Sequence, residues 1–119
     1  DEDLAIWLIR AKGERLAAYS VAGPNTLPHC QEDSAGEIKR IYVQRDYQGQ
    51  GIGKRLVNGM LTWLEDRHYN PIYVGVYSDN IEAQRFYQRF GFDIVGEYIF
   101  PVGQHQDREF IMKKMISDQ

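Results

Sequence analysis

Cysteine is nearly absent from this chain, which has Cys30 alone among its 119 residues. A single cysteine excludes an internal disulfide and suits a reducing compartment, so we expect a cytoplasmic protein. The three histidines, at 29, 68 and 105, show no metal-ligand spacing, and we expect no metal. His29 and Cys30 are adjacent, and neighbouring side chains in an extended loop point apart, which argues against a thiol nucleophile.

Long apolar runs and an excess of basic residues are also missing. No segment approaches the roughly 18 apolar residues of a membrane helix, and the start of the chain does not resemble a signal peptide. The formal net charge is −3, whereas a general nucleic-acid binder shows a basic surplus. We therefore expect neither a membrane nor a nucleic-acid partner, and the mild acidity would suit a cationic substrate.

The residues that are present indicate one globular domain over 1–119. Hydrophobic residues make up 43% of the chain and charged residues 26%, which are ordinary values for a folded protein. Gly13 marks a turn between the first two apolar runs, and a turn around 101–103 joins the last two. The predicted strands lie at 4–11, 15–22, 37–43, 72–77, 92–100 and 108–114, and the predicted helices run from 52 to about 67 and from 80 to 90.

The order of these elements, β-β-β-α-β-α-β-β, predicts a mixed α/β fold with a mostly antiparallel sheet. A β-α-β unit in the middle requires a parallel crossover, whereas hairpins at both ends require antiparallel pairing. Ile38, Ile41 and Val43 do not alternate cleanly, so we expect a bulge or a bend in that strand. Asp79 and Glu82 stand at the spacing of a capping box at the start of the second helix.

A polar, glycine-rich segment joins the third strand to the first helix. Its glycines, at 49, 51 and 53, allow successive backbone N–H groups to face one anion beside the positive end of the helix. A dinucleotide fingerprint fails because Leu56 stands at its third glycine, and a Walker loop fails because Arg55 follows Gly53-Lys54. The remaining pattern is Gln48-x-x-Gly51-x-Gly53, which is either a pyrophosphate cradle or a simple turn.

This loop and a second motif make the chain resemble the GNAT superfamily of N-acetyltransferases from about Leu4 to its end. The second motif, which matches a helix of that family, is Asn80-x-x-Ala83-x-x-Phe86-Tyr87-x-x-x-Gly91-Phe92. The resemblance implies a GNAT-like sheet whose central β-α-β unit binds acetyl-CoA as co-substrate. The pantetheine arm would lie along the third strand and the pyrophosphate on the loop. The implied cofactor-binding residues are Ile41, Tyr42, Val43, Gln48, Gly49, Gln50, Gly51, Ile52, Gly53, Lys54, Asn80, Ala83, Phe86 and Tyr87.

The resemblance also supplies two candidate catalytic residues. Tyr87 matches the position whose hydroxyl protonates the leaving thiolate, and its alternative is a core aromatic on the apolar stripe of its helix. Glu37 is the candidate general base, since several family members carry a catalytic glutamate before the loop. The alternative interpretation of Glu37 is a solvated glutamate at the end of a strand without a catalytic role.

The activity implied by the family is direct transfer of an acetyl group from acetyl-CoA to a primary amine. The stretch from Gly96 to Met112 resembles that of small bacterial polyamine acetyltransferases. Glu97, Asp107 or Glu109 would then attract a cationic acceptor, or else they are surface charges. The alternatives are acetylation of the α-amine of a protein N-terminus and a non-catalytic module that binds coenzyme A for regulation.

The chain departs from the family pattern at its beginning. Family members normally have another strand and one or two helices before the first strand predicted here, and these helices shape the acceptor pocket. Without them an apolar sheet face would be exposed. We therefore expect that residues are missing upstream, so that the domain is incomplete at its N-terminus, or that a second protomer of a homodimer covers this face.

Overall fold

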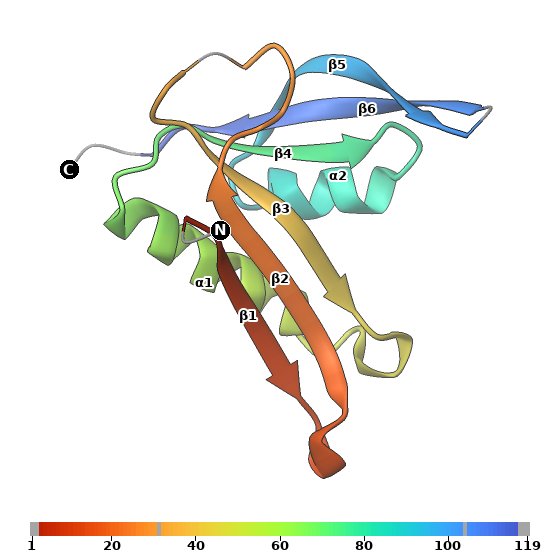
Figure 1. Ribbon diagram of the computed structural model, residues 1–119. Helices are drawn as coiled ribbons and strands as arrows, with labels where there is room; N and C mark the ends of the chain where they lie inside the picture. Colours follow the sequence, from red (N-terminus) through yellow and green to blue (C-terminus); the bar gives the residue numbers. More distant parts are fainter. Residues whose placement is uncertain (1–2, 31, 104, 117–119) are drawn as a thin grey trace.

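The computed structural model describes residues 3–30, 32–103 and 105–116, which form one six-stranded sheet in the order β1-β2-β3-β4-β6-β5. Every neighbouring pair is antiparallel except β3 and β4, which are parallel and joined through α1. This arrangement confirms the predicted fold class (Figure 1). The elements are β1 (Ala5–Arg10), β2 (Leu16–Pro24), β3 (Gly36–Val43), α1 (Ile52–Asp66), β4 (Ile72–Tyr77), α2 (Ile81–Gln88), β5 (Asp93–Val102) and β6 (His105–Lys114).

The hydrophobic core lies between one face of the sheet and the two helices. The apolar stripe of α1 is buried there, with Val57, Met60 and Leu64 fully inaccessible to solvent. These side chains pack in one cluster with residues of β4 such as Ile72 and with residues of α2. Both helices therefore cover the same face. No helix among the described residues is long and apolar enough to cross a membrane.

The last hairpin is longer than the sequence predicted. We expected strands ending at 100 and restarting at 108, but pairing continues to Val102 and His105, and Gly103 (φ 59) lies at the turn. Pro101 suggested a loop because proline cannot donate to a strand ladder. It is tolerated because β5 is the edge strand of the sheet and pairs only with β6.

The third strand contains the irregularity that its uneven pattern predicted. Across the β2–β3 pair, Val21 lies opposite Arg40 but Ala22 lies opposite Ile38, so Lys39 is an extra residue in β3. Such a bulge bends the strand and increases its twist. On its other side β3 pairs with β4 only over Gly36–Ile38, after which the two strands diverge (Figure 1).

One buried hydroxyl in β2 offers a test of the packing. Ser20 is fully buried, and its Oγ has no hydrogen-bond partner among the residues that the structure describes. An unsatisfied buried polar group costs about 1–3 kcal/mol, so Ser20→Ala should raise the free energy of unfolding by about 1 kcal/mol in urea denaturation. The matched control is Ser34→Ala, which removes a hydrogen bond to the Asn70 carbonyl and should be slightly destabilising. Equal losses in both variants would contradict the prediction.

Candidate functional site

The divergence of β3 and β4 creates a split in the sheet with a cavity on each face. On the helix side a cavity of about 370 Å³ lies between the two strands and the start of α2. We call it the helix-side cavity. Its walls come from both diverging strands and from α2. The lining residues are Tyr19, 38–42, 74–77, Asn80, Ala83 and Tyr87.

On the opposite face a cavity of about 400 Å³ lies beneath the loop between β2 and β3. We call it the loop-side cavity. The loop, strands β3 and β4, and the β5–β6 hairpin form its walls. The lining residues are Leu27, 37–40, Gly75, Tyr98, Phe100 and Glu109. Residues 38–40 and Gly75 line both cavities, so the two meet at the split.

The glycine-rich loop lies between the end of β3 and the start of α1. Gly49 (φ 81) and Gly51 (φ 79) both have left-handed backbone conformations that other residues adopt only with strain. Gln48 Nε2 donates to the Val43 carbonyl at 2.9 Å and so closes the loop onto the strand. Gly51 is the N-cap of α1 and gives no side-chain cap, and the first turn of α1 has no acidic residue. The first N–H groups and positive dipole of α1 therefore face this loop, which suits an anion.

The other predicted loop residues divide by exposure. Gln50 and Lys54 are exposed, whereas the side chain of Ile52 is buried against Ala18 and Leu56. Ile52 can therefore offer a ligand only its backbone. Gly53 lies in the first turn of α1, where a Cβ would come 3.6 Å from the ring of Phe86, so the start of α1 and helix α2 are close together.

The second helix begins one residue later than the capping-box pattern predicted. Its N-cap is Asn80, whose Oδ1 accepts a hydrogen bond from the Ala83 amide at 3.0 Å. Asp79 is not the N-cap, because it lies in the preceding turn and its Oδ2 accepts a hydrogen bond from the Tyr77 hydroxyl at 3.0 Å. Gln84 was missed from sequence although it is buried and donates to the Ser78 carbonyl at 2.9 Å, which fixes the turn between β4 and α2.

Tyr87 lies where the core meets the helix-side cavity. Its side chain is 5% exposed and packs edge-on against Phe86 and Phe92, at 5.2 and 5.6 Å between ring centroids. Burial raises the pKa of its hydroxyl well above the ordinary tyrosine value, so the group keeps its proton. Tyr87 also lines the cavity with Ile41, Tyr42, Asn80 and Ala83, so the structure brings five of the predicted residues together. Phe86 packs behind Tyr87 and is not part of the cavity wall.

Glu37 lies in β3 on the loop side and is buried. Its Oε1 accepts hydrogen bonds from the Thr26 amide at 2.9 Å and from the Thr26 hydroxyl at 3.0 Å. Lys39 Nζ forms an ion pair with the same oxygen at 2.9 Å. The carboxylate thus holds the start of the β2–β3 loop against β3. The sequence contained the signal for the ion pair, because residues two apart in a strand share a face.

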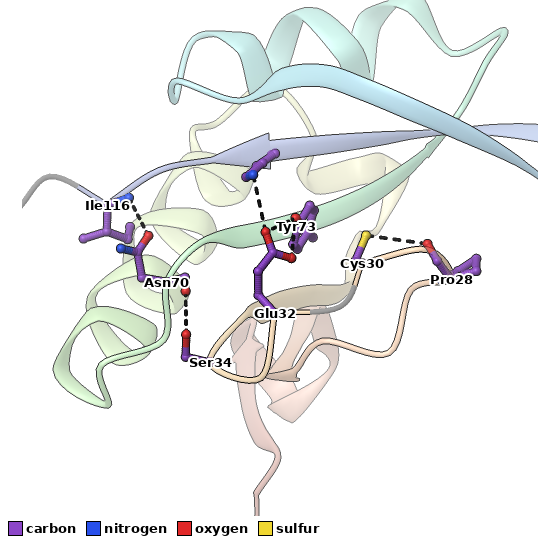
Figure 2. Close-up of polar contacts among 8 residues, drawn as sticks. Pro28, Cys30, Glu32, Ser34, Asn70, Tyr73 and Ile116 are labelled. Atoms are coloured by element: carbon purple, nitrogen blue, oxygen red, sulfur yellow. Dashed lines mark hydrogen bonds and ion pairs between the residues drawn. The ribbon is translucent and has the colours of Figure 1, made fainter.

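Further contacts involve Cys30, Glu32 and Ser34 of the β2–β3 loop (Figure 2). The Tyr73 hydroxyl donates to both carboxylate oxygens of Glu32, at 2.8 and 2.9 Å, and Ser34 Oγ donates to the Asn70 carbonyl at 2.9 Å. The side chain of Cys30 is half-buried and donates to the Pro28 carbonyl at 3.5 Å. The loop that carries Leu27 is therefore a fixed wall of the loop-side cavity.

The loop-side cavity also contains a second carboxylate. Glu109 in β6 lies opposite Tyr77 of β4 and opposite Tyr98 of β5. Burial, and secondarily the charge of Asp107, raise the pKa of Glu109 above its ordinary value. Glu97 is outside this group, because it is exposed and lies 3.7 Å from Arg108 in an ion pair. No cluster of three or more potential metal ligands occurs in the part of the chain that the structure describes.

A sequence model of the acetyltransferase (GNAT) family matches residues 1–92. The spermine/spermidine N(1)-acetyltransferase of Bacillus subtilis is 36% identical over 64 residues, which are 53% of this chain and 42% of that protein. The chain therefore spans less than half the length of this relative.

Solved structures agree with the sequence match. The ribosomal-protein-S18-alanine N-acetyltransferase of Escherichia coli superimposes with a TM-score of 0.79 at 22% identity, covering 100% of this chain and 73% of that one. A GNAT family acetyltransferase of Elizabethkingia anophelis with acetyl-CoA bound gives a TM-score of 0.76 at 17% identity, covering 97% of this chain and 78% of that one. These two likenesses show the fold. The family model matches more than half of the residues of this chain, and the chain therefore belongs to the GNAT family of acetyltransferases.

Proposed function

We propose that this protein transfers the acetyl group of acetyl-CoA to a primary amine, and that the acceptor is a small cationic amine such as a polyamine. The observation that carries this proposal is the split between β3 and β4, which has a cavity on each face. A donor bound on the helix side and an acceptor bound on the loop side would meet within the sheet. Such an arrangement would let the amine attack the thioester directly, without a covalent enzyme intermediate.

Backbone and side-chain groups around the helix-side cavity support cofactor binding there. Beyond Ile38 the edge of β3 that faces β4 has no described strand paired to it, so backbone groups in Ile41–Val43, other than the Val43 carbonyl that accepts from Gln48, are available to the amides of a pantetheine arm. The loop 48–54 would hold the pyrophosphate on its amides and on the positive end of α1. Asn80 at the N-cap of α2 would hydrogen-bond the arm from the other wall.

The reaction needs few protein groups. A neutral amine attacks the thioester carbon and forms a C–N bond, and a backbone N–H near Val43 stabilises the oxyanion. The C–S bond then breaks and Tyr87 donates a proton to the departing sulfur. The proton that the nitrogen releases on becoming an amide passes through solvent and restores Tyr87. The sum converts acetyl-CoA and an ammonium ion into an N-acetyl amine, free coenzyme A and one proton.

The loop-side cavity supports a cationic acceptor. It is lined by the carboxylates Glu37 and Glu109, and by the aromatic rings of Tyr98 and Phe100. The relative that is 36% identical is a polyamine acetyltransferase, whereas the alanine acetyltransferase resembles this chain below 25% identity. Acetylation of a protein N-terminus is thus the less supported alternative. Glu37 and Glu109 are both candidates for the general base. The assignment of Glu37 to this role remains a prediction from the sequence.

The proposal is tested by measuring thiol release from acetyl-CoA with spermidine, amino-acid amides and short peptides, together with calorimetry of coenzyme A. We expect the rate of thiol release to be higher with spermidine than with the peptides. The absence of both thiol release and coenzyme A binding would refute the proposal. Preference for a peptide N-terminus would replace the polyamine acceptor by the α-amine.

The loop can be tested separately through the backbone of Gly51. A side chain in its left-handed conformation costs about 1–2 kcal/mol, so Gly51→Val should reshape the loop and weaken coenzyme A binding about 10-fold. The matched control is Gly13→Val, because Gly13 has the same φ of 79° and equally open surroundings but lies in the β1–β2 turn. Calorimetry should show unchanged affinity for the control. Equal affinity in both variants would remove the loop from the binding site.

A further inference from the structure

One carboxylate in the loop-side cavity is half-buried and has no hydrogen-bond or ion-pair partner in the described part of the chain. Glu109 lines that cavity, and no hydrogen bond or ion pair reaches its carboxylate from the residues that the structure describes. We propose that Glu109 is the general base, which accepts the proton that the acceptor ammonium loses before it attacks the thioester. This assignment rests on the proposed function and adds to it the identity of the residue that makes the amine reactive.

The register of three strands places Glu109 beside the split. β6 lies between β4 and β5, and Glu109 is directly opposite Tyr77 on one side and Tyr98 on the other. Residues directly opposite each other in a sheet project from the same face. That face is the loop-side face, because Tyr98 packs there with Ala35, Tyr73 and Ile111.

The missing side chain at Gly75 provides the space for an acceptor amine. Gly75 lines both cavities, so it marks the point where they meet. A Cβ at this position would lie 3.1 Å from the Tyr98 hydroxyl oxygen and 3.8 Å from Glu109 Oε1. The Tyr98 hydroxyl and the Glu109 carboxylate therefore lie next to Gly75, where the two cavities meet, together with Leu27 Cδ2 at 3.4 Å from the same position. An ammonium held there would be within reach of the Glu109 carboxylate.

Glu37 is less suited to this role because three donors bind its Oε1 and hold this carboxylate against the β2–β3 loop, whereas no described residue holds Glu109 in this way. The Thr26 amide, the Thr26 hydroxyl and the Lys39 ammonium all bind that oxygen. These contacts fix the wall of the cavity, so we assign Glu37 a positioning function. Asp107 lies nearer the hairpin turn and is not part of the cavity wall.

The surroundings of Glu109 favour proton uptake. Its pKa is raised, first by burial and then by Asp107, which brings the carboxylate closer to the ammonium in proton affinity. The charged and titratable groups that face it from β6, β4, β5 and β3 are Asp107, Tyr77, Tyr98, Glu37, Lys39 and Arg40. Of the two cations, Lys39 is paired with Glu37, and no ion pair joins Arg40 to Glu109 among the described residues. The ammonium of the acceptor would therefore meet an uncompensated carboxylate at Glu109.

The proton balance is simple. The ammonium gives one proton to the Glu109 carboxylate and becomes the neutral nucleophile, and Glu109 returns that proton to solvent after the product leaves. Because the pKa of Glu109 is raised, the base is lost by protonation at a higher pH than for an ordinary glutamate. The acid limb of kcat should therefore lie above the usual glutamate range.

The experiment measures kcat against pH at saturating spermidine for wild type, Glu109→Gln, Glu109→Asp and Glu37→Gln. Glu109→Gln should lower kcat about 100-fold at pH 7 and remove the acid limb. The deficit should shrink toward pH 10, where the amine loses its proton to water. Glu109→Asp should keep an acid limb at reduced kcat. Calorimetry with coenzyme A should give the wild-type affinity for each variant, and Glu65→Gln on the exposed side of α1 is the unaffected control.

Other outcomes separate the two proposals. An active wild type whose acid limb survives Glu109→Gln but disappears in Glu37→Gln would overturn the assignment of Glu109 and leave the proposed function intact. A deficit in Glu109→Gln that is constant from pH 7 to 10 would reduce Glu109 to an acceptor-binding group, which also overturns it. Absence of turnover by the wild type with spermidine, amino-acid amides and short peptides would refute the proposed function, and the assignment with it.

Discussion

Tyr87→Phe should lower kcat about 1,000-fold while the affinity for coenzyme A stays within about twofold of wild type. The tyrosine ring is buried against Phe86 and Phe92, and phenylalanine keeps this packing. The change therefore removes only the hydroxyl. The loss of rate with unchanged cofactor affinity would locate the effect in the step where the C–S bond breaks.

The buried position of Tyr87 also predicts the shape of the pH profile. Because burial raises the pKa of the hydroxyl, the protonated form persists to a higher pH than in a free tyrosine. Ionisation of Tyr87 should therefore cause no fall in kcat between pH 7 and 10. A hydroxyl of such low acidity acts by donating to sulfur as the negative charge develops, and not by releasing its proton beforehand.

Steady-state kinetics and calorimetry on Tyr87→Phe, with Tyr69→Phe as control, test this prediction. Tyr69 is half-buried and stacks on Trp63 outside both cavities, so its variant should keep full activity. Full activity in Tyr87→Phe would mean that the proton for the thiolate comes from solvent or another group. A wild type that binds coenzyme A but acetylates none of the amines would favour a non-catalytic binding module.

Local patterns in the sequence were sufficient to predict most of the helices and strands, and they supplied the candidate residues of the cofactor side. The four-residue spacing of apolar residues in α1 and the turn at Gly13 each follow from contacts within a few residues of chain. The glycine loop and helix α2 with its N-cap Asn80 are likewise continuous segments; the loop joins the end of β3 to α1, and Asn80 lines the helix-side cavity. The roles of their residues remain predictions.

The loop side of the site could not be predicted because it depends on the register between distant strands. Glu109 faces Gly75 only because β6 inserts between β4 and β5, an order that no local pattern specifies. From sequence alone Glu97, Asp107 and Glu109 were equivalent candidates. Pairing separates them, since Glu109 enters the cavity and Glu97 remains exposed beside Arg108.

Phe92→Ala should lower the free energy of unfolding by about 3–5 kcal/mol, the largest stability change that we expect from one substitution. Phe92 is fully buried where α2 leads into β5, and it packs on Tyr87 at 5.6 Å. Domains of this size are stable by only about 5–15 kcal/mol, so the variant should lose a large part of that margin.

Urea denaturation measures the effect, with Ile99→Ala as the matched control. Ile99 is 52% exposed on the edge strand β5, so removal of its side chain should change stability by no more than about 0.5 kcal/mol. A loss below about 1 kcal/mol in Phe92→Ala would contradict a close-packed core at this position. The variant should also lose activity at temperatures where it remains folded, because the cavity left at Phe92 frees the ring of Tyr87 beside the split. The core and the site would then be connected through one pair of aromatic rings.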